Sequence, residues 1–322
     1  MASPNLSEVV ATTLRNRSQK LADNYTNNNA LIQRLSERGN INPVRGGRTI
    51  VEEIAYQEND TFTRYSGYET VDISPSDVVT AAEYEIKQAA VSVSISGLEQ
   101  LQNSGKWQTL DLLESRIKNA EGTMMNNLSA DMYSDGTADG GKQMGGLQLL
   151  VADTGLSTAG GISSTTFSFW RNKIYDASTT LGTAISATNI QTAMNNLWLN
   201  TARGRDTTDL IIMDNNYYNF YWTSLQANQR FVNDKMASAG FDNLKFKQAD
   251  VVFDGGDGGS APASHAYFLN TDYIKYRPHA DRNMVPLGAD RFSTNQDAMV
   301  KLIGWAGNMC ASNRARQGVI VE

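Results

Sequence analysis

The feature that most constrains this chain is a long helical pattern at residues 106–133. Its apolar residues recur every three or four positions and so share one face of an α-helix; they are Leu110, Leu113, Ile117, Ala120, Met124, Leu128 and Met132. The opposite face is polar, and no proline interrupts the stretch. At 1.5 Å per residue such a helix is about 40 Å long. We therefore predict a spine helix to which other elements attach.

The stretch before the spine predicts a strand and a hairpin. Residues 91–96 alternate between apolar residues and serine, which indicates a half-buried strand. Residues 48–96 predict one long two-stranded hairpin, with strands at 49–56 and 61–65 and a return strand from Val78. The alternation slips between Lys87 and Ala90, which predicts a bulge or bend. A projecting hairpin is marginal in water, so its apolar residues are expected to pack on another chain: Ile50, Ile54, Phe62, Tyr65 and Tyr68.

Residues 1–48 form a basic arm. They contain seven Lys and Arg against three Asp and Glu, whereas the whole chain has a net charge of −6. Two short amphipathic helices are predicted, at residues 6–21 and 30–37. An arm with so few core residues cannot fold alone, so it is expected to lie on its own body or on a neighbouring subunit. Deleting it is therefore expected to weaken assembly and to leave the body folded. The alternative is an arm that touches nucleic acid.

Residues 141–294 predict an α/β lobe that follows a glycine-rich hinge at 136–146. Two helices are predicted, one with Phe167, Trp170, Ile174 and Ala177 on its inner face, the other opened by a capping box at Thr188 and closed by Gly204. Asp214 is expected to cap a further helix. Short strands are predicted at 209–213, 244–253, 266–269 and 273–276. Residues 299–305 and 319–321 are expected to rejoin the sheet beside the spine.

Composition excludes several classes of protein. The 322 residues are 40% hydrophobic and 19% charged, which indicates a globular chain with two lobes or one elaborated domain. The acidic balance argues against a dedicated duplex-DNA binder. No apolar run approaches the roughly 20 residues of a membrane span, and no secretory signal precedes the arm. The chain is therefore expected to be made in a cytosol, with no membrane partner.

A search for catalytic, metal-binding or cofactor-binding residues predicts none. His265 and His279 lack metal spacing, and no nucleophile elbow occurs. Asp254 and Asp257 lie in a glycine-rich loop that either holds calcium or, as we favour, forms a hairpin tip. The aromatic cluster favours core packing over base stacking; it comprises Tyr217, Tyr218, Tyr221 and Trp222. The lone Cys310 is expected to be a buried hydrophobe.

The order of these parts resembles the major capsid proteins of tailed bacteriophages, which have the Johnson fold shared with herpesvirus capsid floor domains. Residues 27–35 (NNNALIQRL) and 95–105 (ISGLEQLQNSG) also resemble segments of short-tailed phage capsid proteins. The resemblance implies an α+β chain with an N-terminal arm at 1–48, an extended E-loop at 49–77, a P-domain at 78–140 with return strands at 295–322, and an inserted α/β A-domain at 141–294.

The resemblance also implies a function and partners. Copies of the chain are expected to form the hexamers and pentamers of an icosahedral virion shell around packaged double-stranded DNA, assembled in the host bacterial cytoplasm with a portal at one vertex. Only about 48 residues precede the hairpin, so the resemblance implies a separate scaffolding protein or none. A scaffolding protein, a cementing protein, or both are the expected partners. Residues 48–85 contain no lysine, so the Lys–Asn crosslink of some members lacks its nucleophile. The alternatives are an encapsulin-type shell and a cytosolic α/β enzyme.

Overall fold

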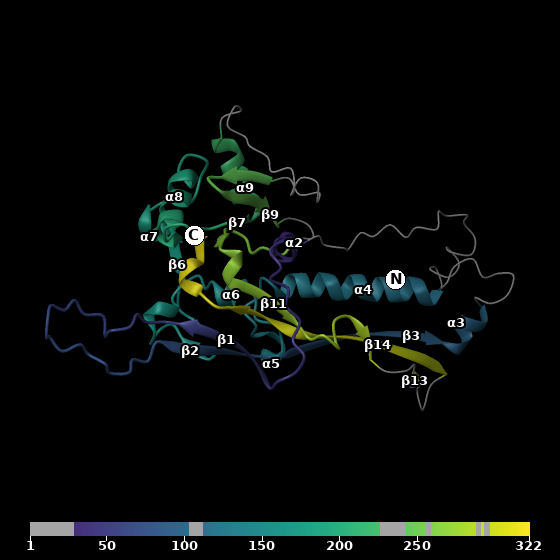
Figure 1. Cartoon of the computed structure of the whole chain (residues 1–322). Coiled ribbons are helices and arrows are strands. Elements are labelled where there is room, and N and C mark those ends of the chain that lie inside the picture. The colour runs from purple at the N-terminus through teal and green to yellow at the C-terminus, as the bar shows by residue number, and fades with distance from the viewer. Residues whose placement is uncertain (1–28, 103–111, 226–242, 256–258, 288–290, 293–296) are drawn as a thin grey trace.

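The computed structural model of the chain describes residues 29–102, 112–225, 243–255, 259–287, 291–292 and 297–322. It is an α+β structure built on two sheets (Figure 1). An elongated layer contains the spine helix and a five-stranded sheet, and a six-stranded sheet with its helices rises from one end of that layer. Among the described residues, no helix has the length and apolar character needed to cross a membrane.

The spine helix is α4 (Leu112–Asp131), 20 residues long and therefore about 30 Å. Four positions of its predicted inner face are buried: Ala120, Met124, Leu128 and Met132, the last just beyond the helix end. Ile117 packs against the same cluster as a partly buried residue. The predicted helix is thus confirmed from residue 112, while its predicted start and Leu110 lie outside the described residues.

The five-stranded sheet is organised around β14 (Ala298–Ala311), which confirms and extends the strand predicted at 299–305. On one side β14 pairs antiparallel with β3 (Lys87–Ser96), from Ala298 opposite Ser96 to Gly307 opposite Lys87. On its other side lie three strands: β11 (Ile274–Pro278), β12 (Val285–Pro286) and β13 (Arg291–Phe292). The short helix α3 (Gly97–Gln102) follows β3. The spine therefore packs on a sheet whose strands come from two distant parts of the chain, residues 87–96 and 274–311.

The six-stranded sheet contains the buried strands predicted for the lobe. Its order is β6 (Lys173–Asp176), β15 (Gly318–Val321), β10 (Ala266–Leu269), β7 (Leu210–Met213), β9 (Ala249–Phe253) and β8 (Asn243–Phe246). The single strand predicted at 244–253 is two antiparallel strands, because Lys247 turns the chain with a φ of +54°. The predicted return of residues 319–321 to the sheet beside the spine is wrong, since β15 pairs with β10 and β6.

Helices α7 (Ala177–Thr180), α8 (Ile190–Thr201) and α9 (Asn215–Ser224) belong to the same lobe. The cap at Asp214 is confirmed, because its side chain accepts a hydrogen bond from the Tyr217 amide. The capping box at Thr188 is wrong, since Asn189 occupies the N-cap. The helical face predicted from Phe167 to Ala177 is also wrong, because this stretch forms a 3₁₀ turn, η2 (Ser168–Trp170), the strand β6 and the first turn of α7.

Both faces of the six-stranded sheet are buried. Ile211, Met213 and Phe268 pack in a cluster with α8 and α9, whereas Leu210 and Tyr267 face the cluster that includes the end of the spine. The lobe therefore shares a core with the spine. The domain division at residues 140 and 294 remains a prediction. Strands β11, β12 and β13 lie within the predicted lobe, but they pair with β14 of the predicted return segment.

The segment that follows the spine, residues 138–163, is folded from short elements. They are α5 (Ala138–Gly141), α6 (Leu147–Leu150), β4 (Thr158–Ala159) and β5 (Ile162–Ser163), and the turns η4 (Thr271–Tyr273) and η5 (Arg314–Arg316) lie later in the chain. Arg314 is fully buried and donates hydrogen bonds to the Leu150 carbonyl at 2.6 Å and the Ser157 hydroxyl at 2.5 Å. Burial lowers the pKa of Arg314 to about 10. This side chain ties the segment to the end of β14.

The predicted hairpin is confirmed at its base. Strand β1 (Thr49–Ala55) pairs antiparallel with β2 (Val79–Glu85), with Thr49 opposite Glu85. The alternation breaks at Ile86, where β2 has ended and β3 has not begun, whereas the bulge or bend predicted between Lys87 and Ala90 is misplaced, because β3 pairs without interruption over those residues. The strand predicted at 61–65 is wrong, because these described residues belong to no ladder. We call residues 56–78 the hairpin loop; it projects beyond β1 and β2 at one end of the molecule (Figure 1).

Candidate interaction surfaces

The hairpin loop carries large apolar side chains in solvent. Phe62 is 74% exposed, Tyr65 66% and Ile73 93%, and Tyr68 is fully exposed. The loop also contains five acidic residues and one arginine. Its turns are closed by local hydrogen bonds, such as that from the Ser66 amide to the Glu69 carboxylate. A group of exposed apolar side chains bordered by charges is typical of an interaction surface.

The base of the hairpin packs on its own chain. Ile50 and Ile54 are buried in the main cluster together with Ala82 and Tyr84. The prediction that Ile50 and Ile54 pack on another subunit is therefore wrong. The alternation that identified them is correct, but the body of the same subunit covers this face of the hairpin. Of the five residues predicted to pack on another chain, Phe62, Tyr65 and Tyr68 are exposed.

Polar contacts fix the hairpin base to the body. The Tyr84 hydroxyl donates to the Ala311 carbonyl at 2.9 Å, and the Asn308 side-chain amide donates to the Glu85 carbonyl at 2.8 Å. The Glu83 amide donates to the Gly160 carbonyl at 2.9 Å. Glu52 of β1 is 5% exposed and approaches Lys275 at 2.6 Å and Arg277 at 3.1 Å. Sequence reasoning missed Glu52, although a charged residue between Ile50 and Ile54 in the buried phase signals such an ion pair.

The contact of β2 with Gly160 predicts a destabilising substitution. In Gly160→Ala the new Cβ would lie 2.6 Å from the Ala82 Cβ and 3.0 Å from the Tyr84 ring. The matched control is Gly161→Ala, which has a similar φ of +73° against +59° but nothing within 4 Å of the new Cβ. Both variants carry backbone strain, so Gly160→Ala should cost about 1–3 kcal/mol more than its neighbour. Equal midpoints in denaturant unfolding would contradict this packing.

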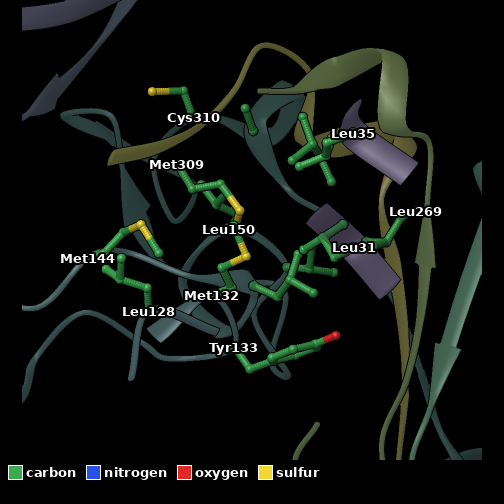
Figure 2. Close-up of a cluster of buried hydrophobic side chains, with 14 of the residues drawn as sticks. Leu31, Leu35, Leu128, Met132, Tyr133, Met144, Leu150, Leu269, Met309 and Cys310 are labelled. Atoms are coloured by element: carbon green, nitrogen blue, oxygen red, sulfur yellow. The ribbon is translucent and has the colours of Figure 1, made fainter. Parts of the chain in front are cut away.

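The described part of the arm, residues 29–48, lies on the body of its own subunit. The helix predicted at 30–37 is confirmed as α2 (Ala30–Glu37), capped by the Asn29 side chain. Leu31 and Leu35 are fully buried, and Figure 2 shows them in one cluster with residues of the spine end, α6 and β14. The predicted helix at 6–21 lies outside the described residues.

Ion pairs hold α2 against the six-stranded sheet. Arg34 lies 3.2 Å from Asp209 and 3.2 Å from Asp250, and its guanidinium also donates to the Asp209 carbonyl at 3.0 Å. Arg38 approaches Asp209 at 3.2 Å. Of the expected positions of the arm, its own body, a neighbour or nucleic acid, the first is therefore confirmed for Arg34 and Arg38.

The two histidines lie in different sheets. His265 precedes β10, with its Nε2 3.1 Å from an Asp153 carboxylate oxygen and its Nδ1 2.6 Å from the Ala263 carbonyl. His279 follows β11, where its Nδ1 accepts from the Asp281 amide. Burial lowers the pKa of His265, but the hydrogen bonds to Asp153 and Ala263 outweigh burial and raise the pKa above its ordinary value.

The raised pKa of His265 predicts a pH dependence of stability. The folded protein holds the proton more tightly than the unfolded chain, so the contribution is fully present below about pH 6.5 and is lost as pH rises through the folded pKa. Asp153→Asn removes the partner. The difference in melting temperature between the natural chain and Asp153→Asn should therefore be larger at pH 6 than at pH 9. A difference that is constant or grows with pH would contradict the pairing.

The remaining candidates have structural environments. Asp254 accepts a hydrogen bond from the Tyr133 hydroxyl at the end of the spine, and burial raises the pKa of Asp254. Asp257 lies outside the described residues. In the described part of the chain, no group of three or more His, Cys, Asp and Glu side chains is placed to hold a metal. Tyr217, Tyr221 and Cys310 are buried, as the core interpretation predicted, whereas Trp222 is 40% exposed.

Comparison with known proteins gives matches in structure only. No family model matches the chain, and neither does any curated protein. The capsid asymmetric unit of cyanophage A-1(L) is 17% identical, with 96% of both chains covered and a TM-score of 0.72. The capsid of an empty GTA particle is 10% identical, with 96% of this chain and 95% of that chain covered and a TM-score of 0.62.

A shell of another kind also matches. The holo-SrpI encapsulin complex of Synechococcus elongatus PCC 7942 is 10% identical, with 97% of this chain and 94% of that chain covered and a TM-score of 0.54. These matches span nearly the whole chain, so arm, hairpin, spine, lobe and return strands are all included. The chain therefore has the Johnson fold of tailed-phage major capsid proteins.

Proposed function

We propose that this chain is a structural major capsid protein that self-assembles into an icosahedral virion shell around packaged double-stranded DNA. The observation that carries the proposal is the match to the cyanophage A-1(L) capsid over 96% of both chains. A fold alone does not fix function, and the exposed apolar side chains of the hairpin loop add an independent argument. Burying Phe62, Tyr65 and Ile73 against a second copy of the chain would stabilise an assembly, because these side chains are exposed in the single subunit. The same contact can repeat around a closed shell.

Self-assembly is tested most simply with the purified protein. Expressed alone and with candidate scaffolding proteins, the chain should elute from a sizing column as particles far larger than its 35.3 kDa. Negative-stain images should show closed polygonal shells. A chain that stays monomeric at every salt and protein concentration would contradict the proposal.

An encapsulin-type shell is the second candidate, supported by the match to the SrpI complex. The contents of particles purified from their natural source separate the two functions. A phage head should protect double-stranded DNA from nuclease, whereas an encapsulin should contain a protein cargo. A cytosolic enzyme is the third candidate, and the structural matches described above do not support it, because they are to capsid and encapsulin proteins.

The partners follow from the proposed shell. They are further copies in hexamers and pentamers, a portal at one vertex, a scaffolding or cementing protein, and DNA bound without sequence preference. Because residues 48–85 contain no lysine and Cys310 is buried, the proposed shell is held by noncovalent contacts. Mature particles should therefore dissolve to single chains in boiling detergent without reductant.

A further inference from the structure

The hairpin of β1 and β2 is attached to the body by side chains and isolated backbone bonds. Among the described residues, β1 and β2 form a separate two-stranded sheet that shares no ladder with the five-stranded or six-stranded sheet. A ladder would fix the angle between two elements through many parallel hydrogen bonds. Here the angle depends on the few contacts at the hairpin base.

These contacts form two groups, one on each strand of the hairpin. Strand β2 is held by Tyr84, by the Glu83 amide and by the Glu85 carbonyl, which bond to the body through Ala311, Gly160 and Asn308. Strand β1 is held by the Glu52 carboxylate, which lies between Lys275 and Arg277. Ile50 and Ile54 of β1 also pack in the main cluster, but apolar packing is not directional, so Glu52 supplies the polar contact that selects one angle for β1.

The arrangement of the two cations makes the Glu52 contact directional. Lys275 and Arg277 are two residues apart on β11 and therefore point to the same face of the sheet. Strand β11 is itself fixed by its ladder with β14. The Lys275 ammonium donates a hydrogen bond to one oxygen of the Glu52 carboxylate at 2.6 Å, and the other oxygen lies 3.1 Å from the Arg277 guanidinium, so both oxygens are directed toward this fixed strand.

A buried charge at this place needs a reason other than stability. Removing a carboxylate from water costs several kcal/mol, and apolar replacements of buried ion pairs are often as stable. The neighbouring inward positions are occupied by Ile50 and Ile54, so an apolar residue fits the pattern of the strand. Compared with an apolar residue at this position, the ion pair adds one defined orientation of β1 relative to β11.

The hairpin loop amplifies any change of angle at its base. Eleven residues in each arm of the loop reach at most about 36 Å when extended. A tilt of about 10° at the base would then move the tip by about 6 Å, which exceeds the width of a side-chain contact.

We propose that Glu52, held between Lys275 and Arg277, fixes the direction in which the hairpin loop leaves the body, and that this direction keeps the shell uniform in size. The second half rests on the proposed function. Glu52 is a positioning residue, since it acts through the loop it orients.

The test compares Glu52→Gln with Glu53→Gln. Both variants remove one negative charge from adjacent residues of β1, but Glu53 is exposed. Hydrogen exchange of the Glu83 amide, which donates to the Gly160 carbonyl of the body, should rise at least tenfold in Glu52→Gln and not in Glu53→Gln when it is measured on the full chain, while exchange in β7 stays constant in both. The distribution of particle diameters should be at least twice as wide for Glu52→Gln.

Three outcomes overturn the proposal in whole or in part. Unchanged exchange in Glu52→Gln overturns the anchoring. Faster exchange with unchanged diameters overturns the effect on the shell. Absence of particles from the natural chain overturns the proposed function, and the exchange result then still decides the anchoring. If Glu52→Gln does not fold, Lys275→Met removes one of the two cations and is measured in the same way.

Discussion

Leu35→Ala is expected to lower the free energy of unfolding of the subunit by about 2–5 kcal/mol. Leu35 is fully buried, and Figure 2 shows it on α2 facing the cluster between the lobe and the spine. Truncating a buried leucine removes its transfer free energy and leaves a cavity. Ile32 on the same helix is only partly buried, so Ile32→Ala serves as the matched control and should cost clearly less. The measurement is denaturant unfolding of unassembled protein.

This result bears on the arm as a whole. The sequence predicts that deleting residues 1–48 leaves the body folded, and the structure contradicts this, because α2 completes the main cluster and pairs Arg34 with Asp209 and Asp250. The role of the arm in assembly is therefore tested by deleting residues 1–28 and keeping α2. Equal unfolding midpoints for Leu35→Ala, Ile32→Ala and the natural chain would show that α2 does not dock as described.

Phe62→Ala is expected to weaken assembled particles strongly and to leave the isolated subunit unchanged. Phe62 is 74% exposed in the subunit, so truncating it removes almost no internal contact. In the proposed shell the ring is buried against a neighbouring copy, where each such side chain contributes roughly 1.5–3 kcal/mol. The contact repeats between all neighbouring copies in the proposed shell. Particles of Phe62→Ala should therefore dissociate at a markedly lower denaturant concentration, which light scattering measures.

Thr63→Ala is the control for this substitution. Thr63 lies in the same loop and is also exposed, but truncating it removes little apolar area. Particles of Thr63→Ala should dissociate as the natural particles do. If Phe62→Ala particles match the control, or if the unassembled Phe62→Ala chain unfolds more easily, the hairpin loop is not the contact surface that its exposure indicates.

Elements with a strong internal pattern were predictable from the sequence. The spine was identified because its apolar period continues for five turns, and β3 and β14 because alternation or continuous apolar character persists over many residues. The helix α2 was predicted despite its eight residues because its apolar residues share one face, and the structure adds that Asn29 caps it.

Short segments failed because they hold too little pattern. Three apolar residues at 319–321 fit either sheet, so their partner strand could not be predicted from the sequence. The spacing of Phe167, Trp170 and Ile174 matches a helix by coincidence, but the segment pairs as β6 with β15. Two strands were merged at 244–253 because Lys247 adopts a left-handed conformation that its residue type does not announce.

The candidate surfaces were predictable in part. Exposure of Phe62, Tyr65 and Tyr68 follows from a hairpin too long for its own core, and it is confirmed. The burial of Ile54 by the same subunit and the pairing of Glu52 with Lys275, 223 residues later in the chain, depend on contacts that no local pattern reports. The same holds for Arg34, whose partners belong to β9 and to the residue before β7.

A cryo-EM reconstruction of particles formed by the natural chain tests the proposed shell and its contacts together. We expect closed icosahedral shells in which the hairpin loop of each copy lies on a neighbouring copy, with Phe62 and Tyr65 buried in that contact and α2 docked on its own body. Particles in which these two side chains remain in solvent, or preparations that contain only single subunits, would contradict it.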